Sequence, residues 1–355
     1  MTSRTRYFLF ASVAVLSLGL CTGLVAYYNG ALPFSAPVAG RSELAYLPAD
    51  STAVAYANVA EVMKSEFRKR IQQALPTGED KQKLLEETGI DLEHDIESVV
   101  AGFTGDDPAQ GGAIVLIRGR FDATKVESMC TAHGATIEVY KGKRLLLGGE
   151  MPKAREGVAS MGSGSHFEVL HNAGGLAFLD SNLLVIGDSG AIKRAIDAAA
   201  SGENVTKNDQ LMKLVDDLRT GNNAWVVGRS DALSNHAGLP DLAKQQLKTV
   251  QWFAVSAHVN AGVSGVVRAE AVDEKAADDL RAVVNGALAA ARMFGGDQNK
   301  GLQAAINSMQ MSGKGKTIAL SFKVSPEVLD MLNGVAGLSN LTHTPTLVKP
   351  KVIKK

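Results

Sequence analysis

Few residues of this 355-residue chain have the types and spacing that catalysis requires. Gly187-Asp188-Ser189-Gly190 places a serine between an aspartate and a glycine, and His133 could act as the base that a serine nucleophile needs. The apolar periodicity predicts that Ser189 begins a helix and that His133 lies on another one. We therefore interpret Ser189 as a helix N-cap, since its hydroxyl can accept a hydrogen bond from a free backbone amide.

The same two segments resemble the nucleophile and histidine segments of trypsin-like serine proteases, but their context differs. In that family both segments lie in a double β-barrel, and a cysteine follows the histidine. Here Cys130 precedes His133, and both segments are predicted to be helical. We expect Cys130 to be a buried, unreactive thiol, because it shares an apolar helix stripe with Val126.

Glycine-rich and histidine-containing segments provide no cofactor site. Gly313 to Thr317 lacks the earlier glycine of a phosphate loop, because Gln310 occupies that position, and a strand is predicted to follow it. This segment therefore predicts a hairpin turn. Gly162 to Ser165 lacks the G-x-S-x-G spacing of a hydrolase, and His166 and His171 have no metal-ligand spacing. We assign no catalytic, cofactor-binding or metal-ligating residue.

The composition is that of a globular protein that does not bind nucleic acid. Hydrophobic residues make up 45% of the chain and charged residues 21%, which is enough apolar surface for a sizeable core. Lysine and arginine total 37, and aspartate and glutamate also total 37, so no overall basic field attracts a phosphate backbone. The two cysteines, Cys21 and Cys130, provide no disulfide framework, so packing must stabilise the fold.

The amino-terminal segment predicts a membrane anchor. Residues 7–28 contain no charged side chain, and this length of helix can cross a hydrocarbon core of about 30 Å. Arg4 and Arg6 precede the segment, and Arg41 is the first basic residue after it. By the positive-inside rule the amino terminus is cytoplasmic. The prediction is therefore a single-pass protein of the bacterial inner membrane with a periplasmic body.

Two alternatives for this segment remain open. A signal peptide could be cleaved after Val38-Ala39-Gly40, although this site lies well beyond the apolar run. A lipoprotein could use Cys21, although Leu20 is bulky where bacterial lipoproteins have a small residue. We rank an uncleaved anchor first because its apolar run is longer than that of a signal peptide.

Composition shifts along the chain predict five segments. The spacer after the anchor is rich in proline, glycine and small residues, and the last segment has four lysines, two prolines and no acidic residue. Between them lie two regions with alternating strand and helix patterns. The predicted segments are a cytoplasmic stub and anchor (1–28), a linker (29–43), a first module (44–203), a second module (204–337) and a flexible basic tail (338–355).

The two regions have the same predicted order of elements, which indicates an internal duplication. Each begins with a strand, Thr52 to Val59 or Ala224 to Gly228, followed by helical and strand segments in the same sequence. In each, an aspartate after a strand, Asp122 or Asp273, is placed to cap a helix. The predicted fold is α+β: two related modules of largely antiparallel sheet, each with helices packed on one face, preceded by one transmembrane helix.

Two short segments resemble a family of uncharacterised bacterial envelope proteins that have an amino-terminal membrane segment. They are the LPAD-containing run Leu47 to Tyr56 and the run Gly89 to Ile96. The resemblance spans about Leu44 to Met129 and implies an envelope location. It implies no catalytic residue, because that family has no established activity.

We therefore expect a membrane-anchored extracytoplasmic protein of unknown activity that works as a non-enzymatic binding or structural envelope module. Its expected partners are the lipid bilayer, through residues 7–28, and an envelope protein, peptidoglycan or lipid. The alternative is an enzyme or small-molecule-binding domain whose site residues lie far apart in the sequence.

Overall fold

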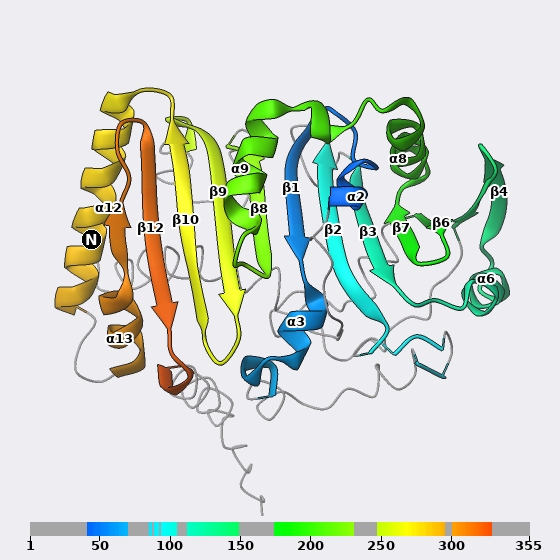
Figure 1. The fold of residues 1–355 in the computed structure, drawn as a ribbon, viewed down its shortest axis with the longest axis horizontal. Helices are drawn as coiled ribbons and strands as arrows, with labels where there is room; N and C mark the ends of the chain where they lie inside the picture. Colours follow the sequence, from blue (N-terminus) through cyan, green and yellow to red (C-terminus); the bar gives the residue numbers. More distant parts are fainter. Residues whose placement is uncertain are drawn as a thin grey trace, which may run out of the picture.

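The computed structural model describes residues 41–69, 85–86, 89–91, 94–104, 112–148, 174–230, 247–294 and 300–328. Its centre is one twelve-stranded antiparallel sheet (Figure 1). Along the sheet the strand order is β11-β12-β10-β9-β8-β1-β2-β3-β7-β6-β5-β4. The fold class is therefore α+β with a large antiparallel sheet, as predicted.

The strands of the first part of the chain occupy one side of the sheet, and those of the second part occupy the other. The first set comprises β1 (Ser51–Ala57), β2 (Ile96–Thr104), β3 (Ala113–Gly119), β4 (Thr136–Tyr140), β5 (Lys143–Leu147), β6 (Gly175–Asp180) and β7 (Leu183–Gly187). The second set comprises β8 (Ala224–Arg229), β9 (Val250–Val259), β10 (Val263–Ala271), β11 (Gln310–Ser312) and β12 (Thr317–Val324).

The two sets meet where β1 pairs with β8, with Tyr56 opposite Trp225. From β1 outward the neighbours are β2, β3, β7 and β6, and from β8 outward they are β9, β10, β12 and β11. The outward order is thus the same on both sides of the junction. On the first side the hairpin β5–β4 extends the sheet further.

Helices cover both faces of the sheet. Strand β8 shows this, since its alternate residues pack into two separate apolar clusters, each of which includes helix residues. Trp225 and Val227 of β8 belong to the cluster that contains Leu211 of α9, whereas Ala224 belongs to the cluster that contains Ala305 of α13. The α8 face carries α2 (Arg41–Leu44), α8 (Ser189–Ser201), the 3-10 turn η1 (Val205–Lys207) and α9 (Asp209–Arg219). The α6 face carries α3 (Val59–Lys64), α6 (Ala123–Ala132), α12 (Glu274–Phe294) and α13 (Lys300–Ser308).

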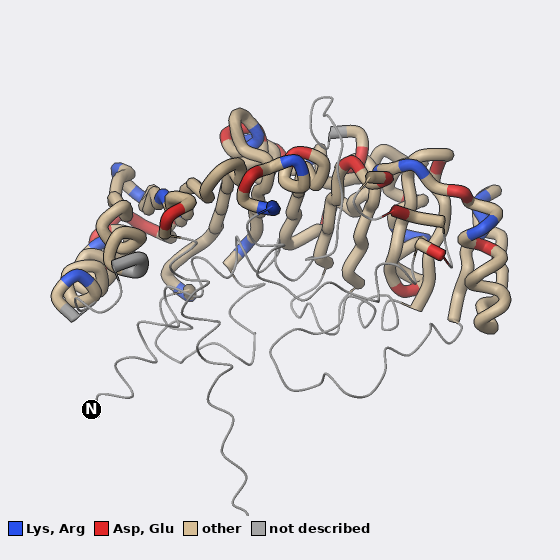
Figure 2. The backbone as a smooth tube through the Cα atoms, turned by 90° about the horizontal axis from the view of Figure 1, so that it is seen from below, with Lys and Arg blue, Asp and Glu red and all other residues tan. Residues whose placement is uncertain are grey.

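The expectation that helices pack on one face is therefore wrong. In β1 all residues from Ser51 to Tyr56 are buried, so this strand has no solvent-facing side. A strand that is apolar on both faces needs cover on both. Seen from below, the sheet is curved, and most charged residues lie in helices and at strand ends rather than in the middles of the strands (Figure 2).

The two aspartates that were predicted to cap helices do so. The Asp122 Oδ1 accepts a hydrogen bond from the Lys125 amide at 3.1 Å, at the start of α6. The Asp273 Oδ1 accepts one from the Ala276 amide at 2.7 Å, at the start of α12. Both helices follow strands with the same place in the outward order, β3 and β10.

The predicted anchor, residues 7–28, lies outside the described residues, as do residues 29–40 of the predicted linker and the whole predicted tail, residues 338–355. Within the described ranges no helix is both long enough and apolar enough to cross a membrane.

Candidate functional site

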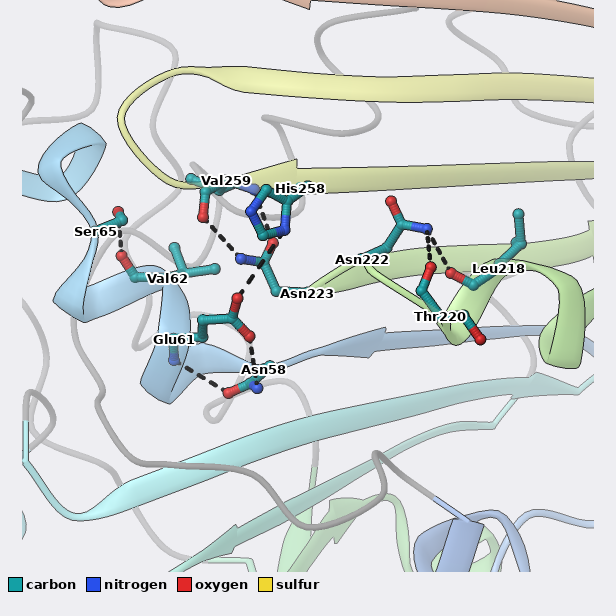
Figure 3. A network of polar contacts seen from close by, with 10 residues as sticks. All are labelled: Asn58, Glu61, Val62, Ser65, Leu218, Thr220, Asn222, Asn223, His258 and Val259. Atoms are coloured by element: carbon teal, nitrogen blue, oxygen red, sulfur yellow. Dashed lines mark hydrogen bonds and ion pairs between the residues drawn. The ribbon is translucent and has the colours of Figure 1, made fainter.

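Polar side chains meet at one end of the central strands β1, β8 and β9 (Figure 3). Asn58 follows β1 and is the N-cap of α3. Its Oδ1 accepts a hydrogen bond from the Glu61 amide at 3.1 Å, and its Nδ2 donates to the Glu61 Oε2 at 3.1 Å. This reciprocal capping fixes the position of the Glu61 carboxylate against the end of the sheet.

Asn223 joins three strands at the same place, and only 1% of it is exposed. Its Nδ2 donates to the Val259 carbonyl at 2.7 Å, and its Oδ1 accepts from the Val259 amide at 2.9 Å. The Asn223 backbone carbonyl accepts from the Asn58 amide at 2.7 Å, and its own amide donates to Ala257 at 3.1 Å. All its polar groups are therefore satisfied, as a buried amide requires.

His258 is the member of this cluster with an unused polar atom. Its Nδ1 lies 4.0 Å from the Glu61 Oε1, which permits an ion pair but is too long for a hydrogen bond. This Nδ1 is buried and has no hydrogen-bond partner among the described residues. A carboxylate beside an imidazole is a combination that general acid–base catalysis uses.

The hydroxyl nearest to this pair along α3 is already engaged. The Ser65 Oγ donates to the Val62 carbonyl and accepts from the Arg68 amide at 3.2 Å, so it caps the end of α3. The contacts of the cluster therefore fix the ends of β1, β8 and β9 relative to α3, and Glu61 and His258 are the carboxylate and the imidazole within it.

A second buried charge lies on the α8 face. Glu43 of α2 is 3% exposed and forms an ion pair with Arg118 of β3, whose Nε donates to the Glu43 Oε1. In the second half Arg268 of β10 pairs with Asp217 of α9 at 3.1 Å, but half of the Asp217 side chain is exposed. Both arginines hold a helix of the α8 face against the sheet.

The structure corrects the assignment at Gly187 to Gly190. Ser189 begins α8 as predicted, but Asp188 and not Ser189 is the N-cap, and the Asp188 Oδ1 accepts from the Ala191 amide at 2.8 Å. Aspartate and serine cap equally well, and Asp188 has the extended backbone that an N-cap requires. The aspartate of this motif therefore has a structural role.

His133 and Cys130 lie on α6, away from any catalytic arrangement. His133 ends the helix, and its Nδ1 is 2.8 Å from the Met129 carbonyl oxygen. Cys130 is a buried free thiol that packs against Val126. Burial, together with the nearby Glu127 carboxylate, raises the pKa of the Cys130 thiol, which disfavours the thiolate.

The remaining candidate motifs divide between a turn and segments that the structure does not describe. Gly313 to Lys316 connects β11 to β12, with the Thr317 amide donating to the Lys314 carbonyl, so the predicted hairpin turn is confirmed. Gly162 to Ser165, His166 and His171 lie outside the described residues. Within the described ranges no three histidine, cysteine, aspartate or glutamate side chains are placed to hold a metal ion.

Sequence reasoning found only part of the central polar cluster. Asn58 and Glu61 have the spacing of a capping box, and the structure has one of its two contacts, from the Glu61 amide to the Asn58 Oδ1, whereas the Asn58 amide donates to the Asn223 carbonyl. Asn223 and His258 were missed, because strand pairing brings them to this place from far along the chain. A paired Asn222-Asn223 directly before a strand was the available signal for a buried amide.

No family profile matches the sequence, and neither does any curated protein. Among solved structures, crystal form I of TP0453 matches with 8% sequence identity and a TM-score of 0.42. The match covers 85% of this chain and 98% of that chain. A similarity of this size does not bear on function. The resemblance to uncharacterised envelope proteins stays a prediction.

Proposed function

We propose that this chain is a membrane-anchored extracytoplasmic protein of the bacterial envelope whose body binds a partner without catalysing a reaction. The observation that carries the proposal is the uncharged segment of residues 7–28, preceded by Arg4 and Arg6. A segment of this kind anchors the chain in the bilayer and leaves the body on the far side. The partner class is an envelope protein, peptidoglycan or lipid.

We further propose that residues 44–203 and 204–337 are two related modules. Support comes from the shared outward order of strands on the two sides of the β1–β8 junction. The matching caps, Asp122 after β3 and Asp273 after β10, support it as well. The modules would then share one sheet rather than stand as separate domains.

A second candidate function is enzymatic, and the Glu61–His258 pair favours it. The pair places an imidazole beside a carboxylate, and the His258 Nδ1 has no hydrogen-bond partner among the described residues, a combination that general acid–base catalysis uses. Replacing His258 by glutamine keeps a polar side chain of similar size but removes the proton acceptor. If a cell lacking the wild-type gene is complemented by His258→Gln, the catalytic candidate fails.

The topology is tested with a reporter fused after Lys355. Alkaline phosphatase folds only outside the cytoplasm, so the fusion should be active, and a cytoplasmic reporter in the same place should be silent. The matched control deletes residues 1–42, which should give a soluble, monodisperse body and an inactive phosphatase. Activity of the cytoplasmic reporter on the full-length chain would overturn the proposal.

The uncleaved anchor and its two alternatives give purified chains of different mass. An uncleaved anchor leaves a membrane-bound chain that begins at the original amino terminus. Cleavage after Gly40 gives a soluble periplasmic product that begins at Arg41, and a lipoprotein begins at a modified Cys21. The mass of the purified chain separates the three, and Cys21→Ser should leave the mass of an uncleaved anchor unchanged except for the substitution.

A further inference from the structure

The two edge strands of the sheet, β11 and β4, differ in length and in side-chain type, and β4 lies at the right-hand edge in Figure 1. The β11 edge has three residues, and Gln310 and Ser312 are its exposed side chains. The β4 edge has five residues and exposes Ile137 by 42% and Val139 by 68%. Short polar edges resist the addition of another strand, whereas apolar edges invite it. The β4 edge has the properties of a binding edge.

At Ile137 and Val139 the backbone amide and carbonyl groups of β4 point away from the sheet. The turn Lys141-Gly142 has positive φ at both residues, and the Tyr140–Lys143 pair closes it. Pairs in an antiparallel ladder alternate between hydrogen-bonded and non-hydrogen-bonded, so Val139 and Ile137 occupy the non-hydrogen-bonded positions. Their amides and carbonyls therefore point outward.

The next strand confirms this alternation. The Gly148 amide, one residue beyond the end of β5, donates to the Gly174 carbonyl on the β6 side at 2.9 Å. Even-numbered residues of β5 thus direct their backbone groups toward β6, and odd-numbered ones direct them toward β4. Leu145, an odd-numbered residue, lies opposite Glu138, so Glu138 is bonded inward and its two neighbours face outward.

The two faces of β4 differ in chemistry. Ile137 lies opposite Leu146, which packs with α6, so Ile137 and Val139 share the α6 face. Glu138 and Tyr140 lie on the α8 face, where Lys193 binds the Glu138 carboxylate at 2.7 Å. An added strand would place side chains beside Ile137 and Val139 on one face and beside Glu138 on the other.

We propose that β4 binds an extended segment of another protein as an additional antiparallel strand. The segment carries apolar side chains opposite Ile137 and Val139, and between them a basic side chain opposite Glu138. Its backbone pairs with the outward groups of Ile137 and Val139, which supplies affinity, and the alternating side chains supply specificity. This inference rests on the proposed function, in that it names the partner as a protein segment.

A second copy of the chain fits this edge less well. Pairing of β4 with its own copy about a two-fold axis at Glu138 sets two carboxylates directly opposite each other, which is destabilising. A two-fold axis at Val139 leaves only Glu138 to Tyr140 in the ladder, because the turn begins at Lys141. The ladder of the second arrangement is too short for a stable dimer, which buries about 800 Å² on each partner.

The test measures binding of a synthetic peptide with a Thr-Val-Lys-Val-Thr core to the full-length chain in detergent micelles, by fluorescence anisotropy. The peptide should bind, and a Thr-Val-Glu-Val-Thr peptide should bind about tenfold more weakly. Val139→Lys should weaken binding of the first peptide by at least about tenfold without lowering the melting temperature. Gln310→Lys at the other edge is the matched control and should bind as the wild type does.

Two further variants separate backbone pairing from simple apolar contact. Val139→Pro removes an outward amide while leaving the β4–β5 ladder intact, so it should also abolish binding. Glu138→Lys should reverse the preference, so that the glutamate peptide binds more tightly than the lysine peptide.

Three outcomes would overturn the inference. The first is no binding of the lysine peptide at about 1 mM, and the second is equal binding by wild type and Val139→Lys. The third is a dimer of the wild type that Val139→Lys dissociates, since a second copy would then occupy β4. The topology reporter does not involve β4, so an active periplasmic phosphatase with any of these results would reject the β4 inference and leave the proposed location intact.

Discussion

The two halves of the sheet have the same outward order of strands but differ in what covers the α8 face. In the first half α8 contacts β3, β6 and β7, and strand residues beneath it such as Leu116 and Val185 are fully buried. In the second half α9 contacts β8 and β9. On that face α9 reaches β10 through the Arg268–Asp217 ion pair, and no helix within the described ranges packs on β12, where Ser321 is half-buried.

The difference shows that strand order and strand composition have separate causes. β7 is buried at every residue, whereas β12 alternates between apolar residues on the α6 face and Ser321 and Lys323 on the other. A covered face requires an apolar strand, and an open face permits polar residues without changing the pairing. The same topology therefore accommodates two different sequence patterns.

The largest expected effect is at the junction of the halves. Trp225 stacks on Tyr56 with ring centroids 5.6 Å apart, and both side chains are buried. Trp225→Ala should lower the free energy of unfolding by about 3–5 kcal/mol, because it leaves a cavity between β1, β8 and α9. Chemical denaturation measures the loss, and hydrogen exchange of β7 and β10 shows whether the halves unfold together.

Trp225→Phe is the matched control. It keeps the aromatic contact with Tyr56 and removes the Trp225 Nε1, a buried donor with no acceptor among the described residues. It should therefore cost less than alanine does. If β7 keeps its protection while β10 loses it in Trp225→Ala, the halves are independent units and the single cooperative sheet is wrong.

The next largest loss of stability is expected for substitutions of the two arginines on the α8 face, Arg118 and Arg268. Arg118→Ala leaves the buried Glu43 carboxylate without its ion-pair partner and should cost about 3 kcal/mol. Arg268→Ala breaks a pair whose aspartate is half exposed and should cost about 1 kcal/mol or less. Thermal unfolding of both variants measures the contrast. Equal losses of unfolding free energy would mean that the deeper burial of Glu43, compared with Asp217, makes no difference to stability.

The two helix caps, Asp122 and Asp273, test the similarity of the two halves rather than their difference. Asp122→Ala and Asp273→Ala each remove a side-chain acceptor from a helix start and should each cost about 0.5–2 kcal/mol. Denaturation midpoints with unchanged slopes measure both. Asparagine at either position keeps the acceptor and should restore most of the loss. A loss at one position alone would weaken the equivalence of α6 and α12.

The smallest effect concerns the hairpin that only the first half has. Asp197 of α8 binds Lys141 at 2.6 Å and the Tyr140 hydroxyl at 3.0 Å. The Lys141 contact, and secondarily that of Tyr140, lowers the pKa of the Asp197 carboxyl. A lowered folded-state pKa means that this stabilisation is present above the ordinary carboxyl pKa of about 4 and is lost as pH falls through the folded value.

Acidification should accordingly raise hydrogen exchange in β4 and β5 relative to β7, after correction for the intrinsic pH dependence of exchange. Asp197→Asn should show no such additional pH dependence, because its side chain does not titrate. An identical pH response in wild type and Asp197→Asn would show that Asp197 does not hold the hairpin.

The elements that the sequence predicted well are those specified by neighbouring residues. Strand patterns such as Ala224 to Gly228, and caps such as Asp122 and Asp273, depend on side chains within a few positions. The spacing of Met63, Phe67, Ile71 and Leu75 predicts one amphipathic helix after β1. In the structure α3 ends at Lys64, where the Ser65 hydroxyl donates to the Val62 carbonyl, and Ile71 and Leu75 lie outside the described residues.

Two features were missed, one with a local signal in the sequence and one without. The nearly unbroken apolar run Thr52 to Tyr56 does indicate a strand covered on both faces, so the one-face expectation overlooked a local signal. The central polar cluster had no such signal, because His258 meets Glu61 only after β1, β8 and β9 have paired. Pairing partners are set by the packed sheet and not by either residue's neighbours.

The β1–β8 pairing also has a consequence during synthesis. β1 is made early, whereas its partner β8 begins only at Ala224, after the rest of the first half has been made. A chain halted at Ser201 would hold β1 as an open edge that is apolar on both faces. Such an edge is a template for aggregation, so prematurely terminated chains should form insoluble aggregates even though they contain every strand of the first half.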